Sequence, residues 1–302
     1  MMNNKKKIKI VFLGTPEFSS IILDKLIENN YKPILVVTAP DKPVGRKNII
    51  TAPITKILAE KHKIPVLQPS KIKDLKTEIE NLKPDLGIVV AYKQIISKDI
   101  LDIPKYGFLN IHPSLLPKYR GPAPIQTAIL NGDKQTGTTI ILIDDKIDHG
   151  KIVSSASYQM PNNITFEELS RELAAISAQL LIQTIPKYIN QKIQPKAQNE
   201  SKVSFTKIIK KENGEIDWSK SAQEIEKQIR AFDPWPGSFF FLKKKDKKIR
   251  IKILKAYISK SENSEKISMK CKKDYLIIEK LQQAGKKPLS AEEFKKGFIW
   301  QQ

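Results

Sequence analysis

The run IKIVFLGTPEFSSIILDKLIE, residues 8–28, decides the fold class. Its first part, Ile8–Leu13, is rich in β-branched residues and ends at a Gly-Thr-Pro turn, which is typical of a short buried strand. Glu17–Glu28 then repeats apolar residues at helical spacing. A buried strand, a tight turn and an amphipathic helix predict the first βα unit of a parallel sheet.

The same alternation continues through the first half of the chain. Leu86–Ala91 and Gly107–His112 are expected strands, and Thr138–Ile143 closes the series. Short apolar strands separated by helices predict an α/β fold, with a mostly parallel, Rossmann-like sheet covered on both faces. The other expected elements are the strands Ile34–Thr38 and Ile64–Leu67 and the helices Ile54–Lys61, Ile72–Leu82, Ile125–Asn131 and Glu167–Ile189.

The last third of the chain has a different pattern. Lys247–Ile258 alternates apolar and basic residues, and Glu265–Lys270 and Asp274–Leu281 also have the composition of strands. One helix, Ala222–Ala231, precedes them. This order predicts a small, mainly antiparallel β domain that closes as a barrel.

A chain of 302 residues with 40% hydrophobic residues is expected to divide into two domains. The polar stretch Asn190–Ser201, with Pro195, is the expected connection. We therefore predict a catalytic domain over 1–189, a linker over 190–203 and a β-barrel domain over 204–302.

The formal net charge is +21, from 53 Lys and Arg against 32 Asp and Glu. Residues 203–302, a third of the chain, hold 24 of those 53 basic residues. So basic a chain either meets a polyanion such as nucleic acid or tolerates strong self-repulsion. Lysine supplies nearly all the charge, and lysine enrichment also arises from genome composition, so both explanations stay open.

Other features of the composition exclude whole classes of protein. The single cysteine, Cys271, excludes a disulfide framework and a cysteine-based zinc site. No apolar run approaches the roughly 20 residues of a membrane span. The basic start, Met1–Lys9, lacks the apolar core of a signal peptide. We expect a cytoplasmic protein.

Asn110 and His112 lie two residues apart in the expected strand Gly107–His112. Residues at this spacing project from the same face of a strand. An amide N–H can donate to a developing oxyanion, and an imidazole can hold or move a proton near neutral pH. The pair indicates acyl-type transfer, although a hydrogen-bonded histidine at a strand end is the plainer alternative for His112.

Asp148 follows the strand Thr138–Ile143 and should lie near its carboxyl end. If that strand is close to Gly107–His112, Asp148 would orient His112 as the third member of a catalytic group. A carboxylate in a solvated turn is the alternative for Asp148 alone. The aspartates and histidine here match no metal-ligand motif, so we expect no metal site.

Two loops should border the same site. The turn at residues 14–16 follows the first strand, and ligands of doubly wound sheets bind at the carboxyl ends of strands. It lacks the three glycines of a dinucleotide fingerprint, so an ordinary strand-to-helix turn also explains it. The loop 114–124 is rich in proline, and a rigid loop suits recognition of a flat heterocycle.

Several motifs, in order along the chain, resemble those of methionyl-tRNA formyltransferases. The central one is NIHPSLLPKYRG, residues 110–121, with DHG at 148–150. The others are VFLGTPEF (11–18), APDKPVGR (39–46), RAFDPWPG (230–237) and QAGKKP (283–288). The resemblance spans about the whole chain, and it implies the formyltransferase fold followed by a small OB-like barrel.

The resemblance implies transfer of a formyl group from 10-formyltetrahydrofolate to the amino group of methionine on initiator methionyl-tRNA. Asn110, His112 and Asp148 would be the catalytic residues, with no metal. Tetrahydrofolate would be bound by Ser114, Leu115, Leu116 and Pro117. The tRNA would be contacted by Lys42 and Arg46 at the acceptor stem and by Lys207, Lys210 and Lys211 near the domain junction.

Three positions depart from the family pattern. The sequence Asp145-Lys146-Ile147 stands where a glycine is usual, Lys93 replaces a frequent glycine, and His149 stands where threonine is common. The first two departures concern loop shape and, with it, cofactor affinity, and they remove no catalytic group.

Three other functions share many of these features. A folate-dependent formyltransferase could act on a small amine, such as an amino sugar nucleotide or glycinamide ribonucleotide, but it should not need a basic β domain. A non-catalytic RNA-binding protein could keep the fold, although the complete trio argues against it. Hydrolysis of formyl-folate differs only in water replacing the amine. We expect a monomer.

Overall fold

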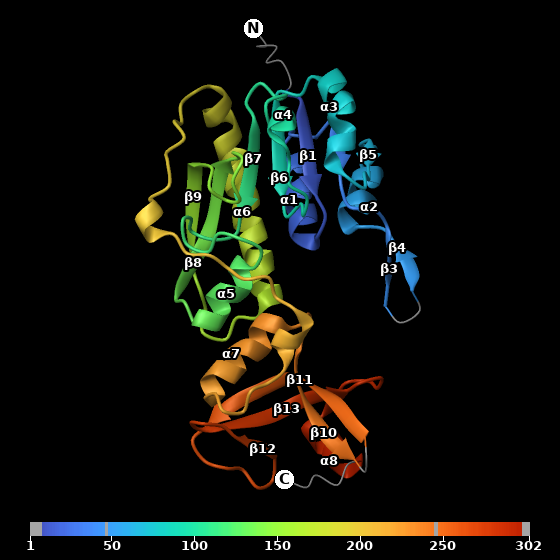
Figure 1. The fold of residues 1–302 in the computed structure, drawn as a ribbon, viewed down its shortest axis with the longest axis vertical. Helices are drawn as coiled ribbons and strands as arrows, with labels where there is room; N and C mark the ends of the chain where they lie inside the picture. Colours follow the sequence, from blue (N-terminus) through green and yellow to red (C-terminus); the bar gives the residue numbers. More distant parts are fainter. Residues whose placement is uncertain (1–7, 46–47, 245–246, 298–302) are drawn as a thin grey trace. The chain divides into compact units, whose positions relative to one another are not determined.

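The structure is a computed structural model that describes residues 8–45, 48–244 and 247–297 (Figure 1). It contains two compact units. The first unit is formed by Met1–Gly121, Gln135–Tyr158 and Ser170–Phe205, and the second by Pro122–Lys134, Gln159–Leu169 and Thr206–Gln302.

The first unit is built on a seven-stranded sheet with the strand order β5-β2-β1-β6-β7-β8-β9. Its first five strands pair in parallel, and β8 runs antiparallel to β7. The strands are β1 (Ile10–Gly14), β2 (Leu35–Val37), β5 (Val66–Leu67), β6 (Leu86–Val90), β7 (Phe108–His112), β8 (Gln135–Leu142) and β9 (Lys151–Gln159). This arrangement confirms the predicted α/β fold with a mostly parallel sheet.

Burial on both faces explains why the central strands are apolar throughout. Every residue of β1 and of β6 is buried. Val11 and Leu13 pack with Ile79 and Ile100 in one core cluster. Phe12, which points to the other face of the sheet, is also 0% exposed. A strand that is buried on both sides has no position for a polar residue.

The helices of the first half begin and end close to the predicted residues. They are α1 (Glu17–Glu28), α2 (Ile54–Lys61), a 3-10 turn η1 (Ile72–Leu75) that leads into α3 (Lys76–Leu82), α4 (Lys98–Leu101), α5 (Pro124–Asn131) and α6 (Phe166–Ile189). α4 was not predicted, because a single helical turn contains too little of the helical period to be detected.

The turn between β1 and α1 requires glycine. A Cβ on Gly14 would stand 2.7 Å from the Cβ of Ser19. The Ser19 hydroxyl accepts from the Thr15 N–H at 3.2 Å and donates to the Val90 carbonyl at 2.7 Å. Ser19 therefore joins this turn to the end of β6, and the close approach depends on the missing side chain of Gly14.

Two further elements of the first unit were not predicted. A hairpin of β3 (Lys42–Val44) and β4 (Ile49–Thr51) has every residue exposed. β9 is an edge strand of small and polar residues with only Val153 buried. Neither element has the buried apolar face that makes a strand recognisable in sequence.

The second unit contains an antiparallel sheet with the order β10-β11-β13-β12, and β14 pairs with β13. Its core includes Ile225 and Ile229 of α7 together with Phe240, Ile251 and Leu281 of the sheet. The elements are η3 (Lys211–Gly214), α7 (Ala222–Phe232), β10 (Ser238–Lys244), β11 (Lys247–Ser259), β12 (Ile267–Lys270), β13 (Tyr275–Gln283), β14 (Leu289–Ser290) and α8 (Ala291–Gly297).

This sheet confirms the predicted antiparallel β domain, in the form of a half-barrel. Among the described strands, β10 and β12 stand at the two ends of the order and do not pair with each other. Within the described ranges, the helices are also too short or too polar to span a membrane.

Candidate active site

The candidate site begins at the carboxyl end of β7, which lies between β6 and β8 in the sheet (Figure 1). Asn110 pairs with Val89 on one side and with Ile141 on the other, and His112 pairs with Thr139. Because side chains alternate along a strand, Asn110 and His112 share a face while Ile111 is buried on the opposite one. The expected common orientation follows from this register.

Asp148 reaches both side chains from the loop between β8 and β9. Its Oδ1 accepts a hydrogen bond from Asn110 Nδ2 at 3.3 Å and lies 3.5 Å from His112 Nδ1. Its Oδ2 accepts from the Gly121 N–H at 2.8 Å. The side chain is 13% exposed. The structure therefore brings Asn110, His112 and Asp148 together, and Asp148 is not a solvated turn carboxylate.

The hydrogen bonds of His112 settle which ring nitrogen carries a proton. Nε2 lies 2.9 Å from the Tyr119 carbonyl oxygen. A carbonyl can only accept, so Nε2 is the donor and holds its hydrogen in every charge state of the ring. Nδ1 faces Asp148 and is the nitrogen that can gain or release a proton. Nε2 thus fixes the orientation of the ring, and Nδ1 faces the carboxylate of Asp148.

The proline-rich loop after His112 is held firmly. The Ser114 hydroxyl donates to the Lys118 carbonyl at 2.6 Å. Thr139 Oγ1 accepts from the Leu116 N–H at 3.0 Å and donates to the Ser114 carbonyl at 2.7 Å. Ser114 and Leu116 are buried, whereas Leu115 and Pro117 are partly exposed. Of the predicted folate-binding residues, Leu115 and Pro117 thus have apolar side chains that a ligand can reach.

A second group of residues surrounds the site and was not predicted. Arg120 is 3% exposed, and its guanidinium donates to Gln198 Oε1 at 3.0 and 2.8 Å. It also pairs with Glu200 at 2.6 and 3.2 Å. Gln198 Nε2 donates to the carbonyls of Asp148 and Gly150, both at 2.8 Å. Arg120 was the one available signal, as a charged residue in a rigid loop; no pattern in the sequence marks Gln198.

The Glu200 carboxylate beside the site is stabilised by a basic neighbour. The hydrogen bonds from Arg120, followed by its charge, hold the pKa of Glu200 below the usual value of a glutamate. His149 lies 2.6 Å from Asp144 and 3.7 Å from Glu200. His149, one of the three departures from the family pattern, therefore joins the edge of this cluster. No group of side chains in the described ranges is arranged to hold a metal ion.

The predicted tRNA-binding residues lie apart from this cluster in the chain. Lys42 starts the exposed strand β3, and Arg46 lies outside the described residues. Lys207, Lys210 and Lys211 are exposed in the stretch before α7, where the Lys210 N–H donates to Asn213 Oδ1 at 2.7 Å. The structure thus leaves these lysine side chains accessible without assigning them a ligand.

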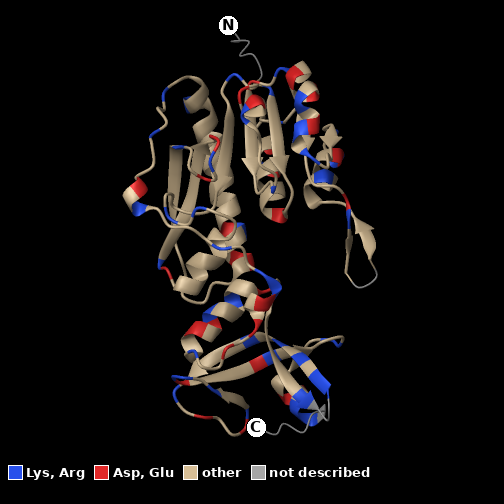
Figure 2. Cartoon of the chain, viewed as in Figure 1, with Lys and Arg blue, Asp and Glu red and all other residues tan. Residues whose placement is uncertain are grey.

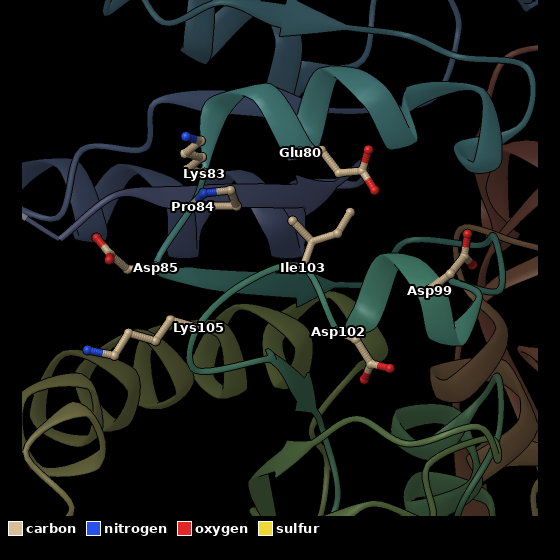
Figure 3. Close-up of a pocket in the computed structure, with 8 residues that line it drawn as sticks. All are labelled: Glu80, Lys83, Pro84, Asp85, Asp99, Asp102, Ile103 and Lys105. Carbon is tan, nitrogen blue, oxygen red and sulfur yellow. The ribbon is translucent and has the colours of Figure 1, made fainter.

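An open depression of about 540 Å³ lies away from the candidate site (Figure 3). Its lining includes Lys83 and Asp85, just before β6, and Ile103 and Lys105, just before β7. It therefore opens at the amino ends of strands whose carboxyl ends face the candidate site. Its lining is mainly charged, with four acidic and two basic side chains, and contains no histidine, serine or cysteine.

Comparison with known proteins identifies the family of this chain. A model of the formyl transferase family matches residues 7–185, and a model of the formyl transferase C-terminal domain matches residues 208–298. A methionyl-tRNA formyltransferase of Bacillus velezensis is 40% identical over 300 residues, which is 96% of this chain and 94% of the relative. One from Chloroflexus aurantiacus is 42% identical over 260 residues, 85% of this chain and 82% of the relative.

A solved structure supports the fold. The N-formyltransferase of Helicobacter canadensis, in complex with folinic acid and dTDP-3-aminofucose, superposes with a TM-score of 0.67 at 23% identity, over 90% of this chain and 98% of that one. At that identity the likeness concerns the fold alone. Full-length similarity at about 40% identity decides the family: the chain belongs to the methionyl-tRNA formyltransferases.

Proposed function

We propose that this chain transfers a formyl group from 10-formyltetrahydrofolate to the amino group of methionine on initiator methionyl-tRNA. The observation that carries the proposal is the meeting of Asn110, His112 and Asp148 at the end of β7. An amide donor, an imidazole and a carboxylate within hydrogen-bonding reach of one another are what acyl transfer to an amine requires.

Asn110 and His112 would stabilise the oxyanion that forms when the amine attacks the formyl carbon. The Asn110 amide has two N–H groups, so it can hold Asp148 with one and donate to the oxyanion with the other. Because Nε2 is bound to the Tyr119 carbonyl, His112 would need a second proton, on Nδ1, to donate to the oxyanion, and that N–H would be shared between the oxyanion and Asp148. One such donor is typically worth about 2.7–4 kcal/mol of barrier.

Asp148 would accept the proton that the methionyl amine releases. It faces Nδ1 of His112 and keeps the ring oriented. The amine loses its proton to Asp148, directly or through a water, as the new carbon–nitrogen bond forms. Asp148, or the same water, then passes this proton to the folate nitrogen as its bond to the formyl carbon breaks, so protons and electron pairs balance without an oxidant or a metal.

The folate would be bound by the loop that follows His112. Leu115 and Pro117 offer partly exposed apolar surface, and Ser114 and Leu116 hold that loop on β8 through Thr139. Flat heterocycles suit such rigid, partly apolar loops. The related fold of the Helicobacter canadensis protein, solved with folinic acid, supports a folate as donor.

The second unit, which includes Lys207, Lys210 and Lys211, would bind the tRNA backbone. Figure 2 shows Lys and Arg gathered along β10 and β11. On the outer face of these strands Phe241 lies opposite Arg250, and Lys243 lies opposite Lys248. Phe241 is 44% exposed. Basic side chains neutralise phosphates and exposed aromatic rings stack on bases, which is how β-sheets bind RNA.

The hairpin β3–β4 would contact the acceptor stem. It exposes Val44, Ile49 and Ile50 by 57%, 60% and 64%, and apolar side chains exposed side by side mark interaction surfaces. Lys42 is the first residue of β3, and Arg46 lies outside the described residues. We propose that the chain acts in the cytoplasm, because translation initiates there. We also propose that it acts as a monomer.

The competing function is formyl transfer to a small amine, which the Helicobacter canadensis complex with an amino sugar nucleotide makes specific. The direct test supplies labelled formyl-folate with charged initiator tRNA, with uncharged tRNA, or with dTDP-3-aminofucose. We expect label on the charged tRNA alone. Label on the sugar, with no effect of excess bulk tRNA, would support the competing function instead.

A further inference from the structure

We propose that residues 196–204, which have the composition of a linker between domains, act as a strap that positions Asp148 and His112 for the reaction. The proposal rests on the proposed function only in taking formyl transfer as the reaction of this site. No strap residue bonds to the Asp148 carboxylate or to the His112 ring in the described part of the chain. The role of the strap is therefore to position these two side chains. All the contacts lie within the first unit.

The first half of the strap holds the loop of Asp148. Lys196 forms an antiparallel bridge with Ile152 through N–H to carbonyl bonds of 2.8 and 2.7 Å. This bridge ties the strap to β9, the strand that follows the loop. Gln198 then donates from Nε2 to the carbonyls on both sides of His149, those of Asp148 and Gly150. A single amide group thus closes the loop around the catalytic carboxylate.

The backbone of that loop needs such support. Asp148 has a φ of 50°, in the left-handed region that few residues other than glycine adopt without cost. A Cβ on Gly150 would collide with the carbonyl oxygen of Leu142, so the loop is pressed against the end of β8. A strained loop keeps one geometry only when neighbouring groups over-determine it, and Gln198 supplies two of the bonds that do so.

The second half of the strap holds the loop that orients His112. The Tyr119 N–H donates to the Ser204 hydroxyl at 2.9 Å, and the Arg120 N–H donates to the Ser204 carbonyl at 2.9 Å. The Ser204 N–H donates in turn to the Pro117 carbonyl at 3.3 Å. Tyr119 is the residue whose carbonyl accepts from His112, so Ser204 fixes the acceptor that sets the ring.

Arg120 joins the two halves. It is buried, and a buried guanidinium must have its charge and its N–H groups satisfied. Gln198 Oε1 and the Glu200 carboxylate do this from within the strap. The neighbouring Gly121 N–H donates to Asp148 Oδ2. Movement of the strap would therefore disturb the carboxylate and the imidazole together.

The test replaces Gln198 with glutamate, which has the same shape and still accepts from Arg120 but cannot donate to the two carbonyls. We expect kcat for labelled formyl transfer to fall roughly 10–100-fold, because small misplacements of catalytic groups cost this much. The dissociation constant of charged initiator tRNA should stay within about twofold, since no strap residue lies in the proposed tRNA surface.

A matched control is Gln228→Glu in α7. Gln228 is also buried and also donates to backbone carbonyls, those of Asn213, Gly214 and Glu215, but in the second unit. A general loss of stability would lower activity in both variants. A role in positioning lowers kcat for Gln198→Glu only.

A double-mutant cycle with Asp148→Asn, read by single-turnover transfer, decides the matter. If Gln198 acts through Asp148, Gln198→Glu should cost little once that carboxylate is absent, so the two losses will not add. Fully additive losses, or wild-type kcat in Gln198→Glu, would overturn the strap. An inactive wild-type chain would instead count against formyl transfer itself.

Ser204→Ala keeps the proposal testable if Gln198→Glu does not fold. It removes only the acceptor of the Tyr119 N–H. The loss of one hydrogen bond should lower kcat roughly 3–10-fold with unchanged tRNA affinity. An unchanged kcat in a folded Ser204→Ala variant would overturn the second half of the strap.

Discussion

The candidate active site and the outer face of β10–β11 differ in the burial and the bonding of their polar side chains. At the site, His112 and Asp148 are 5% and 13% exposed and hold fixed hydrogen bonds. On the sheet face, Lys243 and Lys248 are exposed opposite each other. Buried polar groups act through short, oriented bonds, whereas exposed charges act at longer range and are screened by salt. Chemistry and recognition should therefore respond to different perturbations.

The sharpest way to break this comparison is to truncate the side chains that are proposed to be catalytic. Asn110→Ala and His112→Ala should each lower kcat roughly 100–1,000-fold, because each removes a donor to the oxyanion. The affinity for charged initiator tRNA should stay within about twofold, measured by filter binding on the same preparations. Equal kcat in wild type and both variants would remove these residues from the chemistry.

Salt tests the other half of the comparison. Raising salt from about 50 to 200 mM should weaken tRNA binding roughly 100-fold if the surface neutralises about four phosphates. The rate of a single turnover at saturating tRNA should change little, because the hydrogen bonds of the candidate active site are buried and are therefore screened little by salt. A tRNA affinity that does not depend on salt would show that the basic face is not the binding surface.

Arg46 sharpens the comparison because it is expected to serve selection rather than chemistry. Arg46→Ala should lower the preference for initiator over elongator methionyl-tRNA, in kcat/KM, by about 10-fold, since a specific arginine contact has about this value. The rate with initiator tRNA at saturation should change little. Equal losses on both tRNAs would indicate an ordinary phosphate contact.

Glu200 provides the smallest effect, on stability at acid pH. Its pKa is below the ordinary 4.5 in the folded chain, chiefly because Arg120 donates to it. A carboxyl group whose pKa is lower in the folded chain than in the unfolded chain stabilises the fold at pH values above its unfolded pKa. This stabilisation is lost as the pH falls through its folded pKa. The difference in Tm between wild type and Glu200→Gln should therefore be constant near neutral pH and shrink below pH 4.5. A difference that stays constant as the pH falls well below 4.5 would contradict the ion pair.

Much of the fold could be predicted because apolar periodicity reports burial. Glu17–Glu28 and Ile54–Lys61 are helices over the residues that their spacing predicts. β9 escaped prediction because an exposed edge strand has little apolar pattern. The hairpin β3–β4 escaped for the same reason, since none of its residues is buried.

The site divides in the same way. Asn110 and His112 could be placed on one face because a strand repeats every two residues. The contact of Asp148 with both depended on β8 pairing with β7, which only the structure supplies. Gln198 had no signal, because its partners Asp148 and Gly150 are 50 and 48 residues away in the chain. The prediction of the methionyl-tRNA formyltransferase family is confirmed.

The rate of a single turnover of labelled formyl transfer to charged initiator tRNA, measured for wild type and Asp148→Asn at saturating tRNA, tests the chemistry of this site most directly. Asn keeps the size of the side chain and can still accept from the Gly121 N–H, but it removes the charge that faces His112. We expect wild type to form formylmethionyl-tRNA and Asp148→Asn to do so at least roughly 100-fold more slowly. Equal rates in the two proteins would contradict catalysis by Asn110, His112 and Asp148.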